Sequence, residues 1–480
     1  MSLDFTTAEV QLAVPTKESL EHAEASLVKM LPDTGLGLEH IKKHLLADLA
    51  PGFTGSSRCP TYWAFTTGAV TDAAMLGDWL ATVHDQNVQV HLPDETIATK
   101  LEDTTLRLLQ QLLTFSETDF SGRLFTTGAT ASNLLGLALG REYVVAEAGR
   151  RKLPPAQISV TQVGAVAACI EAGIDDIQVL AASPHSSLYK AASTLGIGRD
   201  SVILVPLSED EPWRFDMQRL REYLSNGAGS IIAISAGEVW TGRFATNGDE
   251  MGQIRALADK HGAWVHVDGA FGLHALILPH TPTYKHLNDG VAALQLADSI
   301  TGDAHKLFNV PYDCGFFFTR HPSIQQAVFK NPSSAYLSTT ALSIPSPLNL
   351  GIENSRRFRA LPLYSSLLAN GRTWHCDLLE RQVALARRIA SYIVDSTVYE
   401  LLPDNDLDKI YMVVLFRARS DSLNSDLVSF INASKRIHVS GLPWKGRPAA
   451  RIAIGTWRVE VDRDFQLVTQ VLDTASRAHQ

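Results

Sequence analysis

The chain has 480 residues, a formal net charge of −9 at pH 7 and 45% hydrophobic residues, which is the composition of a folded globular protein. Its length is two to three times that of a common domain of roughly 100–200 residues, so we expect more than one hydrophobic core. Because 51 acidic residues outnumber 42 basic ones, the composition disfavours a broad basic surface for nucleic acid or for an anionic membrane.

The first 55 residues predict a helical arm. Apolar residues recur at helical spacing over 16–50, apart from a loop at 32–37. The beginning of the chain has no basic stretch followed by an apolar one, as a secretory leader would have. No later apolar run approaches the roughly 20 residues that span a bilayer. We therefore expect a cytoplasmic protein without a membrane partner.

The central part of the chain, 56–354, predicts a large α/β domain. Helical periodicity marks four segments, at 94–113, 132–147, 216–224 and 249–261. Short apolar runs, partly β-branched and bounded by turns, predict strands at 177–182, 201–206, 230–236 and 264–267. Strands and helices that alternate in this way are typical of a mostly parallel sheet with helices on its faces.

The last part, 355–480, predicts a smaller α+β domain. It is preceded by a Ser/Pro-rich segment at 331–349, which is too broken for a helix or strand and long for an inert connection, so we expect a functional loop there. A long helical pattern, two strand candidates and a final helix follow, at 355–396, 410–418, 450–455 and from Asp464. The four cysteines form no CxxC pair, so we expect neither a disulfide framework nor a metal site.

Two segments of the central domain bring together residues suited to carbonyl chemistry. Lys306 follows His305 at the edge of a polar turn, and two adjacent cationic groups disfavour each other's charge. A lysine whose protonation is suppressed is a nucleophile toward carbonyl groups. Asp268 ends an apolar strand candidate, where open α/β sheets bind ligands. Taken alone, a surface lysine and an aspartate that caps a turn explain these residues as well.

Two further segments place polar groups at helix starts. At 125–140 a turn of small residues leads into an apolar helix, whose free N–H groups would hold a phosphate with the hydroxyls of Thr127, Thr130 and Ser132. A simple Thr/Ser helix cap is the alternative. His185 follows a strand candidate at the mouth of another helix, where it either stacks on a planar ligand or belongs to the core.

Together these segments resemble the pyridoxal-5′-phosphate-dependent group II decarboxylases, which include aromatic-L-amino-acid decarboxylase and glutamate decarboxylase. The resemblance rests on the order and spacing of HKLFNVPYDCG, VHVDGAFG, TTGATASN and PHSSLYKAASTLGIG, and it extends over roughly 59–458 through SRRFRALPLYSSLLANGR and AARIAIGTW. It implies a fold type I α/β protein that forms a homodimer with active sites at the subunit interface. The implied reaction converts an L-amino acid into an amine and carbon dioxide.

The resemblance also implies roles for individual residues. Lys306 would hold the cofactor as a Schiff base, and Asp268 would pair with the pyridine nitrogen and keep it protonated. His185 would stack on one face of the ring, while the remaining cofactor contacts would come from Ala129, Thr130, Ala270 and His305. The substrate wall would contain four aromatic residues, which favour an aromatic or other hydrophobic amino acid: Tyr62, Trp63, Phe65 and Trp240.

Three departures from the family pattern leave the reaction outcome open. Leu307 replaces a frequent tryptophan, and Trp240 stands where many relatives have a smaller polar residue. The mobile loop of the animal enzymes supplies a tyrosine that protonates the substrate carbon, and Tyr336 is the only tyrosine in the corresponding segment here. Relatives without that tyrosine can convert the substrate oxidatively to an aldehyde by decarboxylation and deamination. Another lyase reaction or an aminotransferase-like reaction on the same cofactor is a further alternative.

Other readings concern the arginines and the protein class. Arg356 and Arg357 are candidates for an anion contact, or equally for an ion pair at a helix surface or interface. A non-catalytic scaffold derived from such an enzyme is a second class of protein. A dinucleotide-binding oxidoreductase is disfavoured because no GxGxxG motif follows an early strand.

Overall fold

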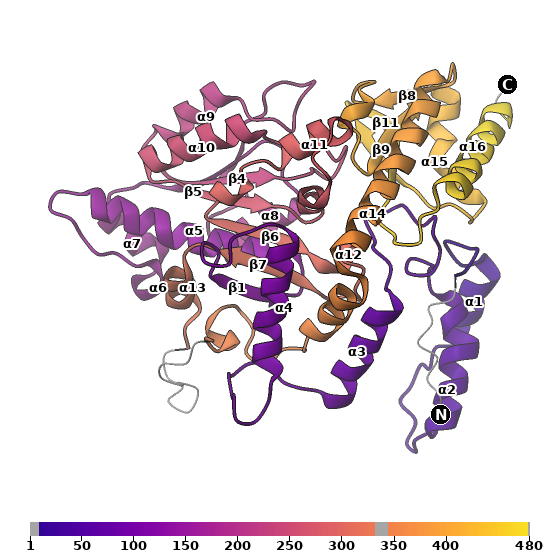
Figure 1. Cartoon of the computed structure of the whole chain (residues 1–480), viewed down its shortest axis with the longest axis horizontal. Coiled ribbons are helices and arrows are strands. Elements are labelled where there is room, and N and C mark those ends of the chain that lie inside the picture. The colour runs from indigo at the N-terminus through magenta and orange to yellow at the C-terminus, as the bar shows by residue number, and fades with distance from the viewer. Residues whose placement is uncertain (1–8, 332–343, 479–480) are drawn as a thin grey trace. The chain divides into compact units, whose positions relative to one another are not determined.

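The computed structural model describes residues 9–331 and 344–478, which fold into two compact units (Figure 1). The first unit consists mainly of residues 71–380 with 408–411, and the second of residues 6–70, 381–407 and 412–480. The long helix α14 (Ala360–Asp395) begins in the first unit and ends in the second. Its backbone leaves the helical conformation at Gly371, where φ is 67°, a value that favours glycine.

A seven-stranded sheet forms the centre of the first unit. Its strands are β1 (Gly122–Thr126), β2 (Ile177–Ala181), β3 (Val202–Leu204), β4 (Gly229–Ser235), β5 (Trp264–Asp268), β6 (Ser299–Asp303) and β7 (Gly315–Thr319). They lie in the order β1-β7-β6-β5-β4-β2-β3. In the part of the sheet that the structure describes, β7 runs in one direction and the other six strands run in the opposite direction. The carboxyl ends of the other six strands therefore meet at one edge.

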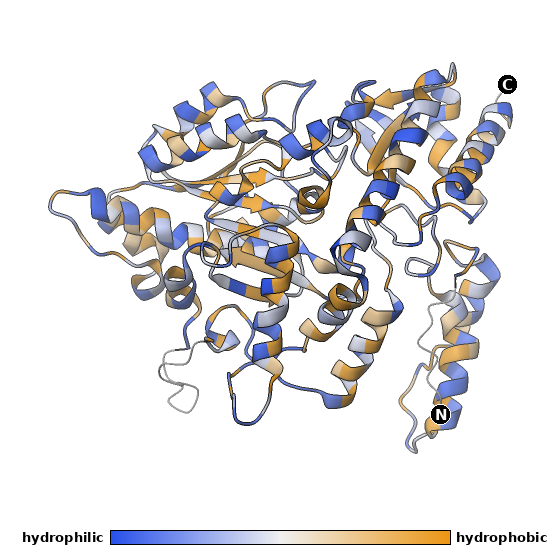
Figure 2. Cartoon of the chain, viewed as in Figure 1, coloured by the Kyte–Doolittle hydropathy of each residue, from blue (hydrophilic) through white to orange (hydrophobic). Residues whose placement is uncertain are grey.

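Helices surround this sheet, as the alternating sequence pattern predicts. They are α3 (Asp72–His84), α4 (Ala98–Leu112), α5 (Ala129–Arg151), α6 (Val160–Val163), α7 (Ala165–Ala172), α8 (Ser186–Thr194), α9 (Met217–Leu224), α10 (Gly248–His261), α11 (Lys285–Gly290), α12 (Ala304–Leu307) and α13 (Pro322–Phe329). Helix α5 packs against β4, β5, β6 and β7. Hydrophobic residues concentrate on the strands, whereas α9 and α10 carry many hydrophilic ones (Figure 2). A sheet that is covered in this way needs apolar residues on both faces.

The start of α10 shows how the local sequence defines where a helix begins. The Asn247 side chain accepts a hydrogen bond from the Glu250 N–H at 2.9 Å, and the Glu250 carboxylate accepts one from the Asn247 N–H at 3.0 Å. This reciprocal capping box satisfies two N–H groups that a helix start otherwise leaves without partners. It positions the helix that leads into β5.

The second unit contains a smaller, antiparallel sheet. Its strands β8 (Tyr399–Leu402), β9 (Val413–Ala418), β10 (Ser440–Trp444) and β11 (Arg447–Ala453) lie in the order β10-β11-β9-β8. Helix α15 (Asp421–Ala433) packs against β9, β11 and α16 (Val461–Ala478). The amino-terminal part of this unit contains α1 (Lys17–Ser26) and α2 (Leu38–Lys43), followed by a π-helix at His44–Leu49 and a 3-10 helix at Ala50–Gly52.

The expected fold class is confirmed, with two local corrections. His305 and Lys306, which we expected at the edge of a polar turn, lie in the short helix α12, directly after strand β6. Helix α5 begins at Ala129 rather than Ser132, so Ala129 and Thr130 belong to its first turn. Among the residues that the structure describes, we find no helix with the length and apolar character needed to cross a bilayer.

Candidate active site

The candidate residues of the first unit gather at the edge of the large sheet where six strands end. Asp268 is the last residue of β5, and Lys306 lies in α12, which directly follows β6. These two strands are parallel neighbours, with Asp268 paired to Thr301. Ala129 follows β1, and His185 follows β2. The parallel strand order thus brings together residues that lie far apart in the sequence, at the edge where α/β sheets bind ligands.

Asp303 organises the surroundings of the lysine. Its Oδ2 lies 2.9 Å from Lys306 Nζ, and its Oδ1 accepts a hydrogen bond of 2.6 Å from the Ala129 N–H. His305 Nε2 lies 3.5 Å from the same Oδ1, and its Nδ1 accepts the Cys314 N–H at 3.2 Å. Burial lowers the pKa of His305, whereas the Asp303 charge opposes this shift. The lysine amine remains reachable, because 23% of its side chain is exposed.

Asp303 is not among the site residues that the sequence predicts. Its signal is a carboxylate three residues before the lysine: Asp303 ends β6 and directly precedes α12, so its side chain reaches the Lys306 amine.

The start of α5 offers N–H groups beside this cluster. Gly128 precedes the helix without a side-chain cap, and a β-carbon at Gly315 would lie 2.4 Å from the Gly128 Cα. Strands β1 and β6 reach this point together, since Thr126 and Asp303 both pair with Gly315 of β7. Thr130 is exposed in the first helical turn. A helix start of this kind attracts anions through its N–H groups and its dipole.

Hydrogen bonds fix both oxygens of the Asp268 carboxylate. Its Oδ2 accepts from Asn133 Nδ2 at 2.8 Å, and its Oδ1 accepts from the Ala270 N–H at 3.2 Å. The Ala270 carbonyl in turn accepts the Asp303 N–H at 3.3 Å, which ties the residues after β5 to the end of β6. Asp268 is therefore a fixed acceptor that a cationic ring nitrogen can meet.

His185 caps α8 and is held by its own helix start. Its Nδ1 lies 2.8 Å from Ser187 Oγ and accepts the Ser187 N–H at 3.2 Å. The side chain is exposed, yet the surrounding protein removes enough bulk water to lower its pKa. The charges of Asp268, Lys306 and Asp303 also act on this pKa, so all three lie within electrostatic range of the imidazole.

This donor set fits pyridoxal 5′-phosphate. Lys306 is a partly exposed amine for the aldehyde, Asp268 an anchored carboxylate for the pyridine nitrogen, and the α5 start a set of donors for the phosphate. Asp303 already accepts from the first N–H of that helix, so the phosphate would use the donors that follow, including the Thr130 hydroxyl.

The other expected site residues have different surroundings. Trp240 is partly buried, and its backbone N–H donates to Glu238 Oε2 at 2.6 Å. Tyr62, Trp63 and Phe65 belong to the second unit, where Trp63 is completely buried and Phe65 is 65% exposed. Tyr336 lies outside the described residues.

The two candidate arginines both form ion pairs within the first unit. Arg356 forms a buried pair with Glu102, and Arg357 forms an exposed pair with Asp78. Of the two interpretations that the sequence left open, the structure favours the ion pair at both positions.

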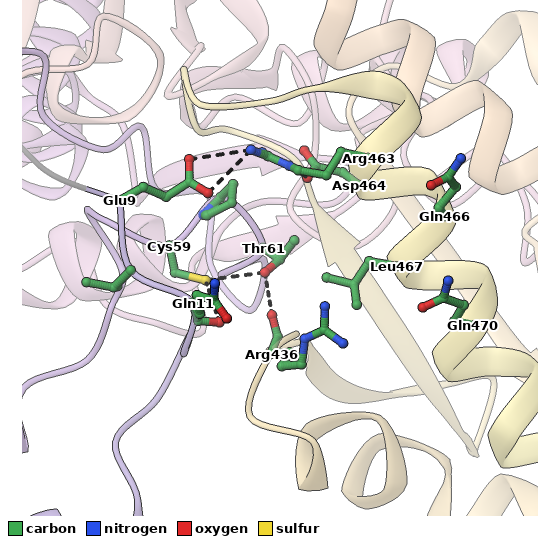
Figure 3. Close-up of a pocket in the computed structure, with 12 residues that line it drawn as sticks. Glu9, Gln11, Cys59, Thr61, Arg436, Arg463, Asp464, Gln466, Leu467 and Gln470 are labelled. Atoms are coloured by element: carbon green, nitrogen blue, oxygen red, sulfur yellow. Dashed lines mark hydrogen bonds and ion pairs between the residues drawn. The ribbon is translucent and has the colours of Figure 1, made fainter.

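The second unit has a pocket of about 290 Å³, lined by residues of the amino-terminal segment and of α16 (Figure 3). Arg463 reaches across it to Glu9 at 3.3 Å and also pairs with Asp464 at 2.8 Å. The Thr61 hydroxyl donates to the Arg436 carbonyl. None of the residues expected to bind cofactor or substrate lines this pocket.

Comparisons with known proteins agree with this arrangement. The model of the pyridoxal-dependent decarboxylase conserved domain matches residues 21–419. L-2,4-diaminobutyrate decarboxylase of Acinetobacter baumannii is 27% identical over 371 residues, which is 74% of this chain and 68% of the relative. Aromatic-L-amino-acid decarboxylase of Catharanthus roseus is 24% identical over 469 residues, or 93% of this chain and 87% of the relative.

Two further similarities concern chemistry and fold. Phenylacetaldehyde synthase of Arabidopsis thaliana is 24% identical over 455 residues, which is 89% of this chain and 85% of the relative. The crystal structure of Catharanthus roseus tryptophan decarboxylase with L-tryptophan superposes with a TM-score of 0.78 at 21% identity. That superposition covers 97% of this chain and 94% of the other, and it establishes the shared fold.

Proposed function

Because the chain belongs to the pyridoxal-dependent decarboxylases, carboxy-lyases that use pyridoxal 5′-phosphate, we propose that it removes the α-carboxylate of an L-amino acid with an aromatic or other hydrophobic side chain. The products are carbon dioxide and the corresponding amine. When bound, the cofactor supplies a protonated pyridine ring that withdraws electrons from the bond that breaks at the substrate α-carbon.

One observation carries this proposal: Asp268 ends β5 and Lys306 follows β6, and these adjacent parallel strands both end at the ligand-binding edge of the sheet. The anchored Asp268 carboxylate stabilises a positive charge on a ring nitrogen opposite to it. The Lys306 amine would bind the carbonyl group of the cofactor, and Asp303 forms an ion pair with that amine. His185 and Ala270 would hold the two faces of the ring, and a fixed ring plane would select the bond that breaks.

The proposed substrate class rests on aromatic residues and on relatives. Trp240, Tyr62, Trp63 and Phe65 would form the substrate wall, and the relatives include an aromatic-L-amino-acid decarboxylase. Replacing Trp240 by leucine should lower kcat/KM more for an aromatic substrate than for a small one. Loss of one aromatic contact should lower kcat/KM for the aromatic substrate roughly 10-fold.

Aldehyde formation is the second candidate outcome. It is favoured by the similarity to phenylacetaldehyde synthase and by the sequence of the segment 331–349, whose only tyrosine, Tyr336, stands near its start. In that case one water and one molecular oxygen are consumed: the substrate loses carbon dioxide and ammonia, its α-carbon is oxidised to the aldehyde with the oxygen atom of water, and molecular oxygen is reduced to hydrogen peroxide.

A product-resolved screen distinguishes these outcomes. The purified enzyme is incubated with each amino acid, and carbon dioxide, amine, ammonia and hydrogen peroxide are measured. We expect amine and carbon dioxide in equal amounts, and Lys306→Ala should remove both. Ammonia and peroxide in place of amine would identify the aldehyde reaction. No product from any amino acid, with cofactor bound, would identify a non-catalytic scaffold.

We further propose a cytoplasmic homodimer with its active sites at the subunit interface, organised as an arm of residues 1–55, a cofactor domain of 56–354 and a small domain of 355–480. Exposed apolar residues of the arm, including Met30 and Leu31, support a partner surface. The four cysteines are all free, which suits a reducing compartment. Light scattering at several concentrations measures the subunit number, and we expect two.

A further inference from the structure

A chain of hydrogen bonds runs behind the candidate site from Trp264 to Asp268. It connects side chains of β5, β6 and α5, and its members Trp264, Ser299, His266 and Asn133 are all buried. Buried polar groups that satisfy one another in this way hold their neighbours in one arrangement. None of the four was expected to bind cofactor or substrate.

The chain begins at the Trp264 indole, which can only donate, and its Nε1 lies 3.0 Å from Ser299 Oγ. Ser299 Oγ also lies 2.8 Å from His266 Nδ1. A hydroxyl that accepts from the indole keeps one proton and one lone pair, so Ser299 can either donate to His266 Nδ1 or accept from it. The other end of the chain decides between the two, because the Asp268 carboxylate only accepts.

Asn133 sets the direction of the chain. Its Oδ1 lies 2.9 Å from His266 Nε2 and can only accept, so the proton of the neutral His266 ring is on Nε2 and Ser299 donates to Nδ1. Asn133 Nδ2 then donates to Asp268 Oδ2 at 2.8 Å and to Ser187 Oγ at 3.0 Å. The opposite amide orientation would place the Asn133 carbonyl against the Asp268 carboxylate and leave two acceptors facing each other. The chain therefore delivers a donor to the carboxylate.

A branch of the chain reaches His185. Because Ser187 Oγ accepts from Asn133, its own proton is available for His185 Nδ1 at 2.8 Å. The Ser187 N–H donates to the same nitrogen at 3.2 Å. His185 Nδ1 is thus an acceptor, and the proton of the neutral ring is on Nε2.

The fold is built to accommodate the neutral imidazole of His266. A β-carbon at Gly136 would lie 2.4 Å from both Cε1 and Nδ1 of His266, so only glycine fits at this place in α5. Complete burial lowers the pKa of His266 to about 4, and the charge of Asp268 opposes this shift. The ring is neutral at physiological pH, as the direction of its hydrogen bonds requires.

We propose that Asn133 is a positioning residue, which the one-way chain from Trp264 uses to hold the Asp268 carboxylate toward the cofactor ring nitrogen and to fix the His185 proton on Nε2. This inference rests on the proposed function for the identity of the cofactor. Asn133 itself acts through Asp268 and through Ser187, each of which it contacts directly.

The test compares two cofactors rather than two activities. Cofactor-free full-length enzyme is titrated with pyridoxal 5′-phosphate and with 1-deazapyridoxal 5′-phosphate, in which a C–H group replaces the ring nitrogen. Asn133→Leu should weaken binding of the natural cofactor roughly 10-fold or more, because it removes a hydrogen bond to a charged group. Binding of the deaza analogue should change little.

Two matched variants separate positioning from general loss of structure. Gln110→Leu also removes a buried amide of the first unit, whose Nε2 donates to the Phe120 carbonyl at 2.7 Å. Ser187→Ala removes only the hydroxyl of the branch toward His185, whose Nδ1 still accepts the Ser187 N–H. Neither variant should change the ratio of the two affinities. An equal loss of both affinities in Asn133→Leu, or an equal change of the ratio in Gln110→Leu, would overturn the proposal.

Nitrogen NMR of the ¹⁵N-histidine-labelled, cofactor-free enzyme tests the direction of the chain independently. We expect neutral His266 and His185 rings protonated on Nε2, assigned with His266→Gln and His185→Gln. An Nδ1-protonated or doubly protonated His266 would contradict the chain. The cofactor titration and the NMR experiment measure binding and protonation without turnover. A failed decarboxylation assay therefore does not decide whether Asn133 positions Asp268. Failure of the wild-type enzyme to bind pyridoxal 5′-phosphate would instead refute the proposed function.

Discussion

Adjacent arginines in the first unit provide a matched test of what a buried charge contributes to stability. Arg356 Nη1 lies 2.6 Å from Glu102 Oε1, with 1% and 4% of the two side chains exposed. Arg357 Nη2 lies at the same 2.6 Å from Asp78 Oδ1, but 45% and 30% of these side chains are exposed. Replacing either arginine by methionine removes one charge and keeps a similar side-chain volume.

The expected losses of stability differ because water can solvate Asp78 after its arginine is removed, whereas Glu102 is buried and stays without a partner. Removing one member of a buried ion pair costs about 3–5 kcal/mol, since it leaves an uncompensated charge. Removing one member of an exposed pair costs about 0–1 kcal/mol. Arg356→Met should therefore lower the free energy of unfolding by at least about 2 kcal/mol more than Arg357→Met.

The loss in Arg356→Met should also depend on pH. Burial raises the pKa of Glu102 from 4.5 to about 7, and the Arg356 guanidinium opposes this rise. Without the guanidinium the pKa of the folded state rises further, so the unfolded chain binds fewer protons than the folded chain above about pH 5. The destabilisation is therefore smallest at low pH and grows as the pH rises through the folded-state pKa.

Urea unfolding at about pH 5.5 and about pH 8 measures both effects, and hydrogen exchange in α4 locates them around Glu102. The double variant Arg356→Met/Glu102→Leu removes both charges and should recover most of the stability. Equal losses in the two arginine variants, or a loss in Arg356→Met that is greater at low pH, would refute the reasoning.

Three further predictions concern single side chains. Gly136→Ala should destabilise the enzyme by about 1–3 kcal/mol, because the added β-carbon clashes with His266. Gly252→Ala in α10 should stabilise the enzyme by up to about 1 kcal/mol, because a β-carbon there meets no neighbouring atom within 4 Å. Thermal unfolding of the two variants measures the difference. Proton titration by NMR should find a pKa below 6.5 for His185 in the cofactor-free enzyme, and a higher value would show that desolvation does not dominate there. Asn247→Ala should cost about 1 kcal/mol by removing the cap of α10, and Asn247→Asp should retain most of the stability in the same unfolding assay.

The elements of the large sheet could be predicted because each carries a local signal. Apolar runs with β-branched residues marked β2, β4 and β5, and helical periodicity marked α9 and α10, to within a residue or two of the observed bounds. Strand β6 has no such signal, because its SITGD sequence contains small and polar residues rather than an apolar run. Its residues are buried because the strand lies between β5 and β7 and packs against α5, which no local pattern reveals.

The candidate site divides in the same way. Asp268 and Lys306 could be identified, because each stands in a distinctive motif next to a strand or turn signal. Asn133 could not, although it lies in the TTGATASN motif, since its importance depends on contacts with His266 and Asp268, which are more than 130 residues away in the sequence. Such contacts depend on strand order and helix packing, and the sequence distance between two residues determines neither.

The most direct measurement asks where vitamin B6 becomes attached. The enzyme is loaded with pyridoxal 5′-phosphate, reduced with borohydride, digested and mapped by mass spectrometry, with Lys306→Ala treated in parallel. We predict a phosphopyridoxyl group on the peptide that contains Lys306 and none at the corresponding peptide of the variant. A modified lysine elsewhere, or no modified peptide from a fully loaded enzyme, would contradict the account.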